Sequence, residues 1–327
     1  MKRRNLVVGL TLVLAAPVSV RAQAAPSCPV AAIDSAGMMR DVFRLADDSM
    51  RGRRVGTPEG AKARDFFAAR FDALGLGRVA PGRVQPFTTT GRNGSSINGY
   101  NVVGTVMGSK FPNEFIVVSA HFDHIGAVGP GAQCRAAGAD SICNGADDNA
   151  SGSAGMLALA TYFAREKPQH TLVFVAFDGE ESGDVGSRAW VAAAPISLAN
   201  ILVDVNLDMV GRNVKNQLFA AGPNKYPQLM PLAEQTVACT KGITLTIGHD
   251  GTGSYAGRED WTGQSDQAAF HSKKIPFVYF GEEDHDDYHK VGDSPDRLMP
   301  GFYAASVRAV ADFILRFDAK PVQRRAP

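Results

Sequence analysis

Several strand-length segments of the chain are apolar at nearly every position instead of at every second position. Continuous apolar runs of this length are typical of strands that are covered on both faces. Segments with helical spacing alternate with these runs, so we predict a three-layer α/β/α sandwich with a central mixed, mostly parallel sheet. The predicted strands are 101–106, 115–120, 171–177, 201–207, 243–247 and 275–280; the predicted helices are 58–74, 156–165, 228–240 and 302–317; residues 91–99 are a predicted surface turn.

The first 22 residues have the composition of an export signal. Basic residues at positions 2 to 4 precede an apolar run from Leu6 to Val20, and small residues follow it. This pattern predicts a signal peptide over residues 1–22 and an exported protein, periplasmic or extracellular. The apolar run is shorter than the roughly 20 residues that cross a membrane, so we expect no stable membrane insertion once the signal is removed. The sequence leaves the export route open between the general secretory and twin-arginine pathways.

Length and charge limit the fold and the partners that are possible for the remainder of the chain. With 327 residues and 45% hydrophobic content, the chain can bury a large core in one sizeable domain or two small ones, and we favour one domain over residues 23–327. Removing the four basic residues of the signal takes the formal net charge from +1 to −3. No basic cluster remains that could neutralise a run of phosphates, so we expect no nucleic-acid partner. The arginine-rich segment Arg51–Arg54 is predicted to be a solvated turn, with a functional role as the alternative.

The chain has four cysteines, and export would place them where disulfides persist. Cys134 and Cys143 flank a short loop, and we predict a bridge between them. A second bridge between Cys28 and Cys239 is possible, but the sequence does not determine connectivity. Unpaired buried thiols are the alternative.

Polar residues of metal-binding type follow the predicted strands. His121 and Asp123 follow the strand 115–120, and on an extended chain they point to the same side. Asp123 can then accept a hydrogen bond from the imidazole and fix its tautomer, which would make His121 a metal ligand. A structural pair is the alternative for this motif taken alone. We interpret His124 as a supporting or surface residue.

Asp148 lies in a turn that leads into a predicted helix, within Gly145–Gly152. A carboxylate held there could bridge two cations, although acidic residues also cap helices. Glu180 and Glu181 are adjacent acids at the end of a strand, and they repel each other unless a cation or a proton offsets the charge. We predict that Glu181 binds a metal and that Glu180 accepts a proton from water. A solvated acidic turn is the alternative.

Two further residues complete the candidate set. Asp208 ends an apolar strand, where burying a carboxylate is costly without a partner. His289 lies in an acidic loop beyond the last predicted strand. Three carboxylates and two imidazoles suit zinc, with cobalt or manganese as substitutes.

The order His, Asp, Glu-Glu, Asp, His in these contexts resembles the dizinc exopeptidases of the aminopeptidase S and aminopeptidase Y type, which include bacterial leucyl aminopeptidases. The resemblance covers about residues 98 to 300 and is most specific around Gly145–Gly152 and Glu180-Glu181. It implies two Zn²⁺ ions with a shared carboxylate, and a cis peptide bond after the bridging Asp. The implied ligands are His121 and Asp208 for one ion, Glu181 and His289 for the other, and Asp148 for both.

The resemblance also implies a reaction. The chain would be an aminopeptidase that hydrolyses N-terminal residues from peptides with a free N-terminus, using a zinc-bridging water activated by Glu180. Tyr288 would stabilise the oxyanion, and Asp266 is a candidate acidic group on the rim for the substrate's amino terminus. No segment is long enough for the protease-associated insert that several relatives carry.

Three other functions are alternatives for a chain with these residues. A related dizinc carboxypeptidase or deacylase usually inserts a lid between its fourth and fifth ligands, and the segment from Asp208 to His289 reads as core strands and helices instead. A glutaminyl cyclase-like acyltransferase works with one zinc, whereas this chain has all five ligands. A non-catalytic, metal-stabilised binding protein would lack the base or a ligand, and none is missing here.

Overall fold

The computed structural model describes residues 28–29, 31–90, 94–129, 132–251 and 259–320. The predicted signal peptide, residues 1–22, lies outside these ranges. Among the described residues, no helix combines the length and the apolar character needed to span a membrane.

The described strands form one mixed sheet in the order β1-β2-β4-β3-β5-β8-β6-β7. Its centre is parallel, because β4, β3, β5 and β8 run in the same direction, whereas β1, β2 and β6 each join an antiparallel neighbour. The strands are β1 (Val84–Thr90), β2 (Ser96–Val106), β3 (Phe111–His121), β4 (His170–Phe177), β5 (Ile201–Leu207), β6 (Gln217–Ala221), β7 (Thr244–Ile247) and β8 (Phe277–Gly281).

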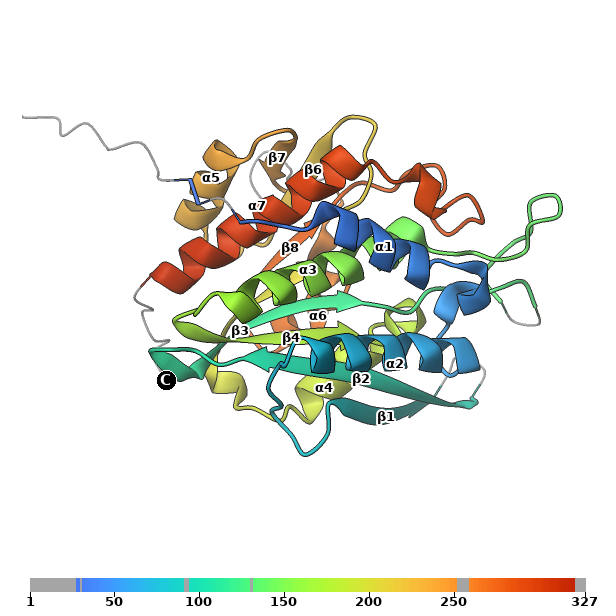
Figure 1. Ribbon diagram of the computed structural model, residues 1–327, viewed down its shortest axis with the longest axis horizontal. Helices are drawn as coiled ribbons and strands as arrows, with labels where there is room; N and C mark the ends of the chain where they lie inside the picture. The colour runs from blue at the N-terminus through green and yellow to red at the C-terminus, as the bar shows by residue number, and fades with distance from the viewer. Residues whose placement is uncertain (1–27, 30, 91–93, 130–131, 252–258, 321–327) are drawn as a thin grey trace, which may run out of the picture.

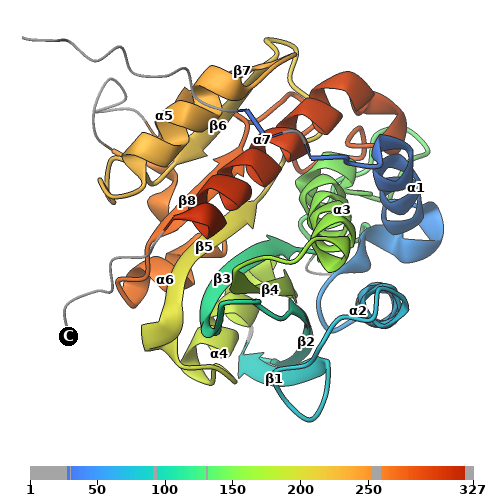
Figure 2. The same ribbon diagram turned by 60° about the vertical axis from the view of Figure 1, so that its left-hand side comes forward.

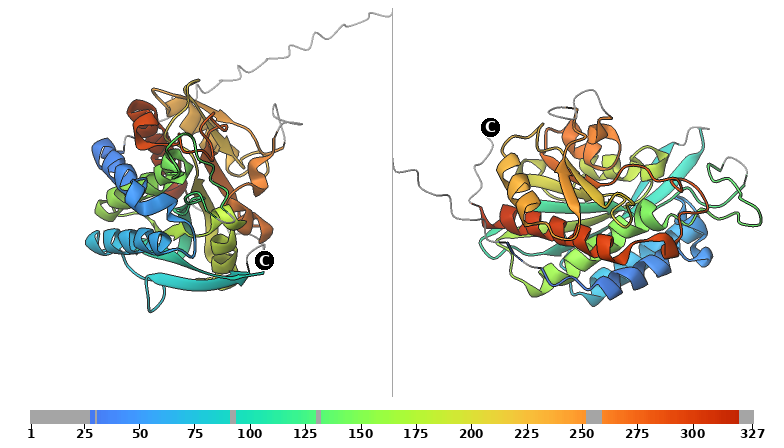
Figure 3. Two further views of the ribbon diagram at one scale, coloured as in Figure 1. Left: turned by 90° about the vertical axis from the view of Figure 1, so that its right-hand side faces the viewer. Right: turned by 90° about the horizontal axis from the view of Figure 1, so that it is seen from above.

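Helices cover both faces of this sheet, which confirms the predicted three layers. One face carries α1, α2, α3, α5 and α7, and the other carries α4 and α6 (Figure 1, Figure 2). Viewed from the side, the sheet lies between the two helical layers (Figure 3). The helices are α1 (Ser35–Leu45), α2 (Pro58–Ala73), α3 (Gly152–Arg165), α4 (Val185–Ala192), α5 (Met230–Cys239), α6 (Gln267–Ser272) and α7 (Pro300–Ala319).

The continuous apolar runs are explained by this double cover. In β4 every residue is buried. Leu172 and Phe174 belong to the large core under α3 and α7, while Val173 and Val175 belong to the smaller core under α4 and α6. Because successive side chains of a strand point to opposite faces, a strand with helices on both sides must be apolar at every position.

Most predicted elements are found close to their predicted bounds. The strand predicted at 201–207 matches β5, and α2 begins where Thr57 accepts a hydrogen bond from the N–H of Gly60. Five short or weakly apolar elements, α1, β1, α4, β6 and α6, were not predicted. The predicted turn at 91–99 is wrong in its second half, because Ser96 begins β2, which pairs with β1; residues 91–93 lie outside the described ranges.

Both disulfides considered from the sequence are present. Cys134 bonds to Cys143, as predicted, and Cys28 bonds to Cys239 at the end of α5. The described residues contain no free cysteine. The second bridge fastens the beginning of the described chain to the layer that contains α5 and α7.

Candidate metal centre

The five predicted ligands converge at the carboxyl ends of the central strands. His121 is the last residue of β3, and Asp208 directly follows β5. Glu181 lies in a short 3-10 helix after β4, and Asp148 lies in the turn before α3. His289 comes from the loop that follows β8. Parallel strands present their carboxyl ends at one edge of the sheet, which explains why residues far apart in sequence meet here.

Asp148 lies between two groups of side chains. Its Oδ1 is 3.6 Å from Nε2 of His121, which is itself 3.2 Å from Oδ1 of Asp208. Its Oδ2 is 3.1 Å from Nε2 of His289, which is 3.1 Å from Oε2 of Glu181. The two carboxylate oxygens of one residue therefore face two separate His–carboxylate pairs, the arrangement that a bridging ligand needs.

The turn that carries Asp148 is held by its neighbours. The Asp148–Asn149 peptide bond is cis, as the resemblance implied. The Asn149 side chain donates to the carbonyl of Leu207 at 2.9 Å and accepts from the N–H of Gly152 at 2.9 Å. Asp293 accepts a hydrogen bond from the N–H of Asp148 at 3.0 Å. These bonds connect the turn to α3, to β5 and to the loop that brings His289.

Asp123 contacts His121 differently from the prediction. Its carboxylate Oδ1 lies 3.6 Å from Nδ1 of His121, too far for a hydrogen bond, and the backbone carbonyl of Asp123 lies closer, at 3.3 Å. The same Oδ1 accepts the N–H of Glu180 at 3.0 Å. With oxygen atoms facing Nδ1, the proton belongs on that nitrogen and Nε2 keeps its lone pair for the centre. Asp123 thus orients Glu180 as well as His121.

Glu180 points at the first group. Its Oε2 lies 4.0 Å from Nε2 of His121, and its side chain is 14% exposed. Burial, together with the nearby Glu181 and Asp208, raises the pKa of Glu180 well above its usual range. The residue is therefore suited to accept and hold a proton.

His124 is the residue that the sequence interpretation underestimated. It is completely buried, and its Nδ1 lies 2.8 Å from Oε1 of Glu181 and 3.6 Å from Oδ2 of Asp148. Burial lowers the pKa of His124 to about 3, so its imidazole is neutral. The available signal was the burial of its neighbours Phe122 and Ile125, since a polar residue inside an apolar segment needs a partner.

Tyr288 and Asp266 have different environments from each other. The Tyr288 ring stacks on His289, with ring centroids 3.9 Å apart, and burial near Asp148 raises the pKa of its hydroxyl, which stays protonated. Asp266 directly precedes α6 and is completely buried. Asp266 is therefore not exposed at the surface, but its charge adds to the effect of burial in raising the pKa of Glu180. Its contact with a substrate's amino terminus stays a prediction.

A further group behind the centre was not predicted. Donor atoms of Asp147, Glu282 and His285 lie within 4.8 Å of one another. His285 accepts the N–H of Asp287 at Nδ1, which leaves its proton on Nε2, 3.5 Å from Oδ2 of Asp147. Because Asp147 is the neighbour of Asp148, this group contacts the turn that carries the bridging residue.

The electrostatics of the centre favour bound cations. Burial opposes charge on His289, yet Asp148 and Glu181 raise its pKa to about 10. Burial likewise opposes charge on His121, yet Asp208 and Glu180 raise its pKa well above the usual value. The carboxylates outnumber the imidazoles, so the site attracts positive charge.

The donor set fits two zinc ions. Two groups of donor atoms share Asp148, and within each group the atoms lie within 4.8 Å of one another. Imidazole nitrogens and carboxylate oxygens are common zinc ligands in catalytic sites. The first consists of His121, Asp148 and Asp208, and the second of His124, Asp148 and Glu181. The imidazole of His289 lies 3.1 Å from the carboxylates of both Asp148 and Glu181, so it adds a second nitrogen donor beside the second group.

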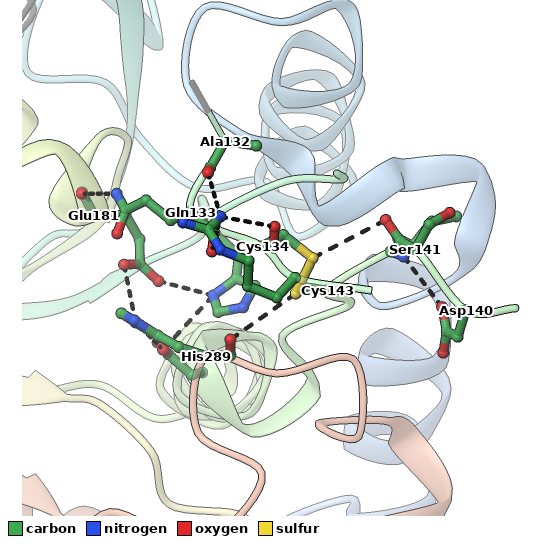
Figure 4. Close-up of a disulfide and its surroundings, with 12 residues drawn as sticks. Ala132, Gln133, Cys134, Asp140, Ser141, Cys143, Glu181 and His289 are labelled. Carbon is green, nitrogen blue, oxygen red and sulfur yellow. Dashed lines mark hydrogen bonds and ion pairs between the residues drawn. A yellow bond between two sulfur atoms is a disulfide. The ribbon is translucent and has the colours of Figure 1, made fainter. Parts of the chain in front are cut away.

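A disulfide-closed loop forms one wall beside the second group (Figure 4). Gln133 donates a hydrogen bond to the backbone carbonyl of Glu181 at 3.3 Å. Sγ of Cys143 lies 4.0 Å from the backbone carbonyl oxygen of His289. The bridge between Cys134 and Cys143 therefore fixes a segment that contacts two predicted ligands through their backbone.

Comparison with known proteins agrees with this geometry. Residues 101–314 match the sequence profile of peptidase family M28. The chain is 30% identical over 214 residues to a probable zinc metalloprotease of Phaeosphaeria nodorum, an alignment that covers 63% of this chain and 42% of that protein. The chain thus spans less than half the length of this relative.

Solved structures with the same fold include two kinds of enzyme. BSAP, a zinc aminopeptidase from Bacillus subtilis, superposes with a TM-score of 0.69 at 15% identity, covering 91% of this chain and 98% of that one. Porphyromonas gingivalis glutaminyl cyclase superposes with a TM-score of 0.68 at 17% identity, covering 86% and 98%. At these identities the likeness concerns the fold, so the choice between their reactions depends on the residues of the site.

Proposed function

Because the chain belongs to peptidase family M28, we propose that it is an exported dizinc aminopeptidase that removes N-terminal residues from peptides, with residues 23–327 as one catalytic domain. The observation that carries this proposal is the division of the Asp148 oxygens between two His–carboxylate pairs. His121 and Asp208 would hold one zinc ion, Glu181 and His289 the other, and Asp148 both. When bound, the ions would supply Lewis-acid activation of water and of the scissile carbonyl.

Glu180 is proposed as the general base. Its backbone is held by Asp123, and its carboxylate faces the His121 group. Its raised pKa favours acceptance of a proton from the attacking water and its later transfer to the leaving amine.

Tyr288 is proposed to stabilise the oxyanion. Its hydroxyl stays protonated, because burial and nearby carboxylates raise its pKa, so it can donate a hydrogen bond to a developing negative charge. The ring is oriented by its stacking on His289. The surplus of carboxylates in the centre would also attract the free ammonium group of a peptide substrate.

The test measures metal content and hydrolysis of a panel of aminoacyl anilides by the purified mature protein. We expect about two zinc ions per chain, and for Glu180→Gln a fall in kcat of about 10²- to 10⁴-fold with both ions retained. Glu283→Gln is the matched control, since this half-buried acid pairs with Lys215 and His249 and with no predicted ligand, so the variant should keep wild-type activity.

Other outcomes would contradict the proposal. Cyclisation of N-terminal glutaminyl peptides without anilide hydrolysis would indicate the cyclase reaction. Cleavage of N-blocked peptides that have free carboxylates would indicate a carboxypeptidase or deacylase. Full zinc loading without turnover of any of these substrates would indicate a binding protein.

A further inference from the structure

Arg53 is a buried cation immediately behind the metal centre. The prediction of a solvated turn at Arg51–Arg54 is wrong for this residue: Arg51 is exposed, whereas Arg53 has no exposed surface. Burying a guanidinium is costly unless its donors are satisfied, so its environment requires an explanation.

All five N–H donors of the Arg53 side chain have a backbone carbonyl oxygen as partner. A guanidinium offers five donors in a fixed planar arrangement, so this set uses its full capacity. The acceptors are Phe122 at 2.5 Å from Nε, Leu45 at 3.3 Å and Asn144 at 2.5 Å from Nη1, and Gly145 at 2.6 Å and Asp148 at 3.5 Å from Nη2.

Four of these five carbonyls belong to two of the three chain segments that present the first group, those of His121 and Asp148. Phe122 lies between His121 and Asp123 in the sequence, and the other three carbonyls lie at or just before Asp148. Among the described residues, no carboxylate forms an ion pair with Arg53, so its positive charge acts on Asp148 and Asp123 through space. Its hydrogen bonds act on the backbone of the ligands, not on their side chains.

The local backbone directs Arg53 inward. Arg51, Gly52 and Arg53 all have positive φ, at 43°, 65° and 37°, a region that residues with a Cβ rarely adopt. A Cβ on Gly52 would lie 2.3 Å from the carbonyl oxygen of Cys143 and 2.8 Å from Cα of Gly126. The turn therefore packs closely against the loops beside the centre. Its unfavourable backbone conformation persists because the surrounding structure holds it, and in this conformation the Arg53 side chain reaches the segments that carry the predicted ligands.

We propose that Arg53 is the positioning residue of the metal centre: its planar set of five hydrogen bonds holds the segments of His121 and Asp148 at the separation that lets them share one cation. This inference rests on the proposed zinc site and adds a determinant of metal affinity outside the ligand set. Residues that orient metal ligands typically change metal affinity by about 10- to 100-fold when they are replaced.

Replacing Arg53 by lysine or by methionine separates the effect of its hydrogen-bond geometry from the effect of its positive charge. Arg53→Lys keeps the positive charge but offers three donors from one nitrogen, which cannot reproduce the planar arrangement. Arg53→Met removes the charge and all donors at similar length. If positioning is the role, both variants bind zinc more weakly by about 10- to 100-fold; if only charge matters, the lysine variant binds as the wild type does.

The chain offers a matched control in Arg83. This residue is 7% exposed and donates five hydrogen bonds, three to the backbone carbonyls of Gly77, Val103 and Leu76 and two to the carboxylate of Asp72. None of these partners is a predicted ligand or lies beside one in the sequence. Arg83→Lys and Arg83→Met therefore lose a comparable set of hydrogen bonds and should keep wild-type zinc affinity.

The experiment titrates zinc into each metal-free full-length protein against a competing chelator. The absorption spectrum of the cobalt-substituted form reports the ligand geometry, and circular dichroism confirms that the metal-free variants are folded. We expect weakened binding and an altered cobalt spectrum for both Arg53 variants and for neither Arg83 variant.

Three results would overturn the inference. One is wild-type zinc affinity in folded Arg53→Lys and Arg53→Met. Another is wild-type affinity in the lysine variant alone, which would assign the role to charge. The third is unfolding of both metal-free Arg53 variants, which would make the residue a determinant of the fold and not of the ligands. Failure of the wild type itself to bind zinc would instead refute the proposed function.

Discussion

Two buried aspartates, one within β5 and one directly after it, show how position in the sheet decides what a carboxylate does. Asp204 lies in the middle of β5, and Asp208 lies just beyond its end. Asp204 is completely buried and Asp208 is 7% exposed, so both have left water. The groups around the two carboxylates differ, and therefore the free-energy cost of burying each carboxylate is offset in a different way.

The middle of the sheet surrounds its aspartate with neutral groups. The Ser119 hydroxyl lies 2.8 Å from Oδ1 of Asp204, and the neighbouring Asn206 side chain donates to Ser265 and Gln267. Burial raises the pKa of Asp204 to about 8, since no cation stands beside it. The carboxyl group is therefore neutral at pH 7 and needs only a proton.

The rim of the sheet gathers charge instead. Asp208 lies 3.2 Å from Nε2 of His121, and carboxylate oxygens of Asp148 and Glu180 lie 3.6 Å and 4.0 Å from the same nitrogen. Several carboxylates in one place are better offset by divalent cations than by separate protons. The comparison teaches that a buried acid alone is weak evidence of a metal site, while several acids around an imidazole are strong evidence.

The largest expected difference between the two positions is in metal binding. Asp208→Asn should weaken zinc binding by more than about 100-fold, beyond the effect of losing an orienting residue, because a ligand is lost. Asp204→Asn should leave zinc affinity unchanged. Chelator competition on both metal-free variants measures the difference. Equal affinities in the two variants would remove Asp208 from the ligand set.

The next effect is on stability and concerns the middle of the sheet. The pKa of Asp204 is raised to about 8 in the folded protein, so between about pH 4 and 8 the folded state binds a proton that the unfolded state has lost. The stabilisation by this group is complete below about pH 4 and is lost as the pH rises through 8. Asp204→Asn removes this dependence. The difference between the free energies of unfolding of the variant and the wild type should therefore shift in favour of the variant by about 5 kcal/mol across that interval.

Denaturant unfolding of the metal-free proteins at several pH values checks this expectation. The informative quantity is how the difference in unfolding free energy between variant and wild type changes with pH. The new amide also changes the energy of the hydrogen bond with Ser119, but that change is the same at every pH. A difference that stays flat from pH 4 to 8 would mean that Asp204 is ionised in the folded state.

The smallest expected effect concerns the loop closed by the Cys134–Cys143 disulfide, which lies beside the metal centre. Replacing Cys134 and Cys143 together by serine opens a short loop and should lower the free energy of unfolding by about 2 kcal/mol. Hydrogen exchange should become faster around Glu181 and His289, whose backbones this loop contacts, while the amides of β5 stay protected. Unchanged hydrogen exchange around Glu181 and His289 would show that the loop is rigid without its disulfide.

The sequence by itself determined the layers and predicted which residues meet at the carboxyl ends of the strands. Continuous apolar runs predicted strands covered on both faces, and β5 lies where it was predicted. Each predicted ligand follows a strand or lies in a turn or loop beside one, and the topology of parallel strands brings such positions together. Short elements with mixed composition were missed: β1 is a half-exposed edge strand that contains Pro86, so its pattern is weak.

Only the tertiary structure decided which polar residues lie behind the centre. The local sequence predicts a solvated turn at Arg53, a supporting or surface role for His124 and a rim position for Asp266, and it does not show that all three side chains are completely buried. Local patterns report the face on which an apolar side chain packs, because burial of apolar surface follows the period of the element. Burial of a charged residue depends instead on carbonyls and charges contributed by distant segments, and those partners become adjacent only when the chain has folded.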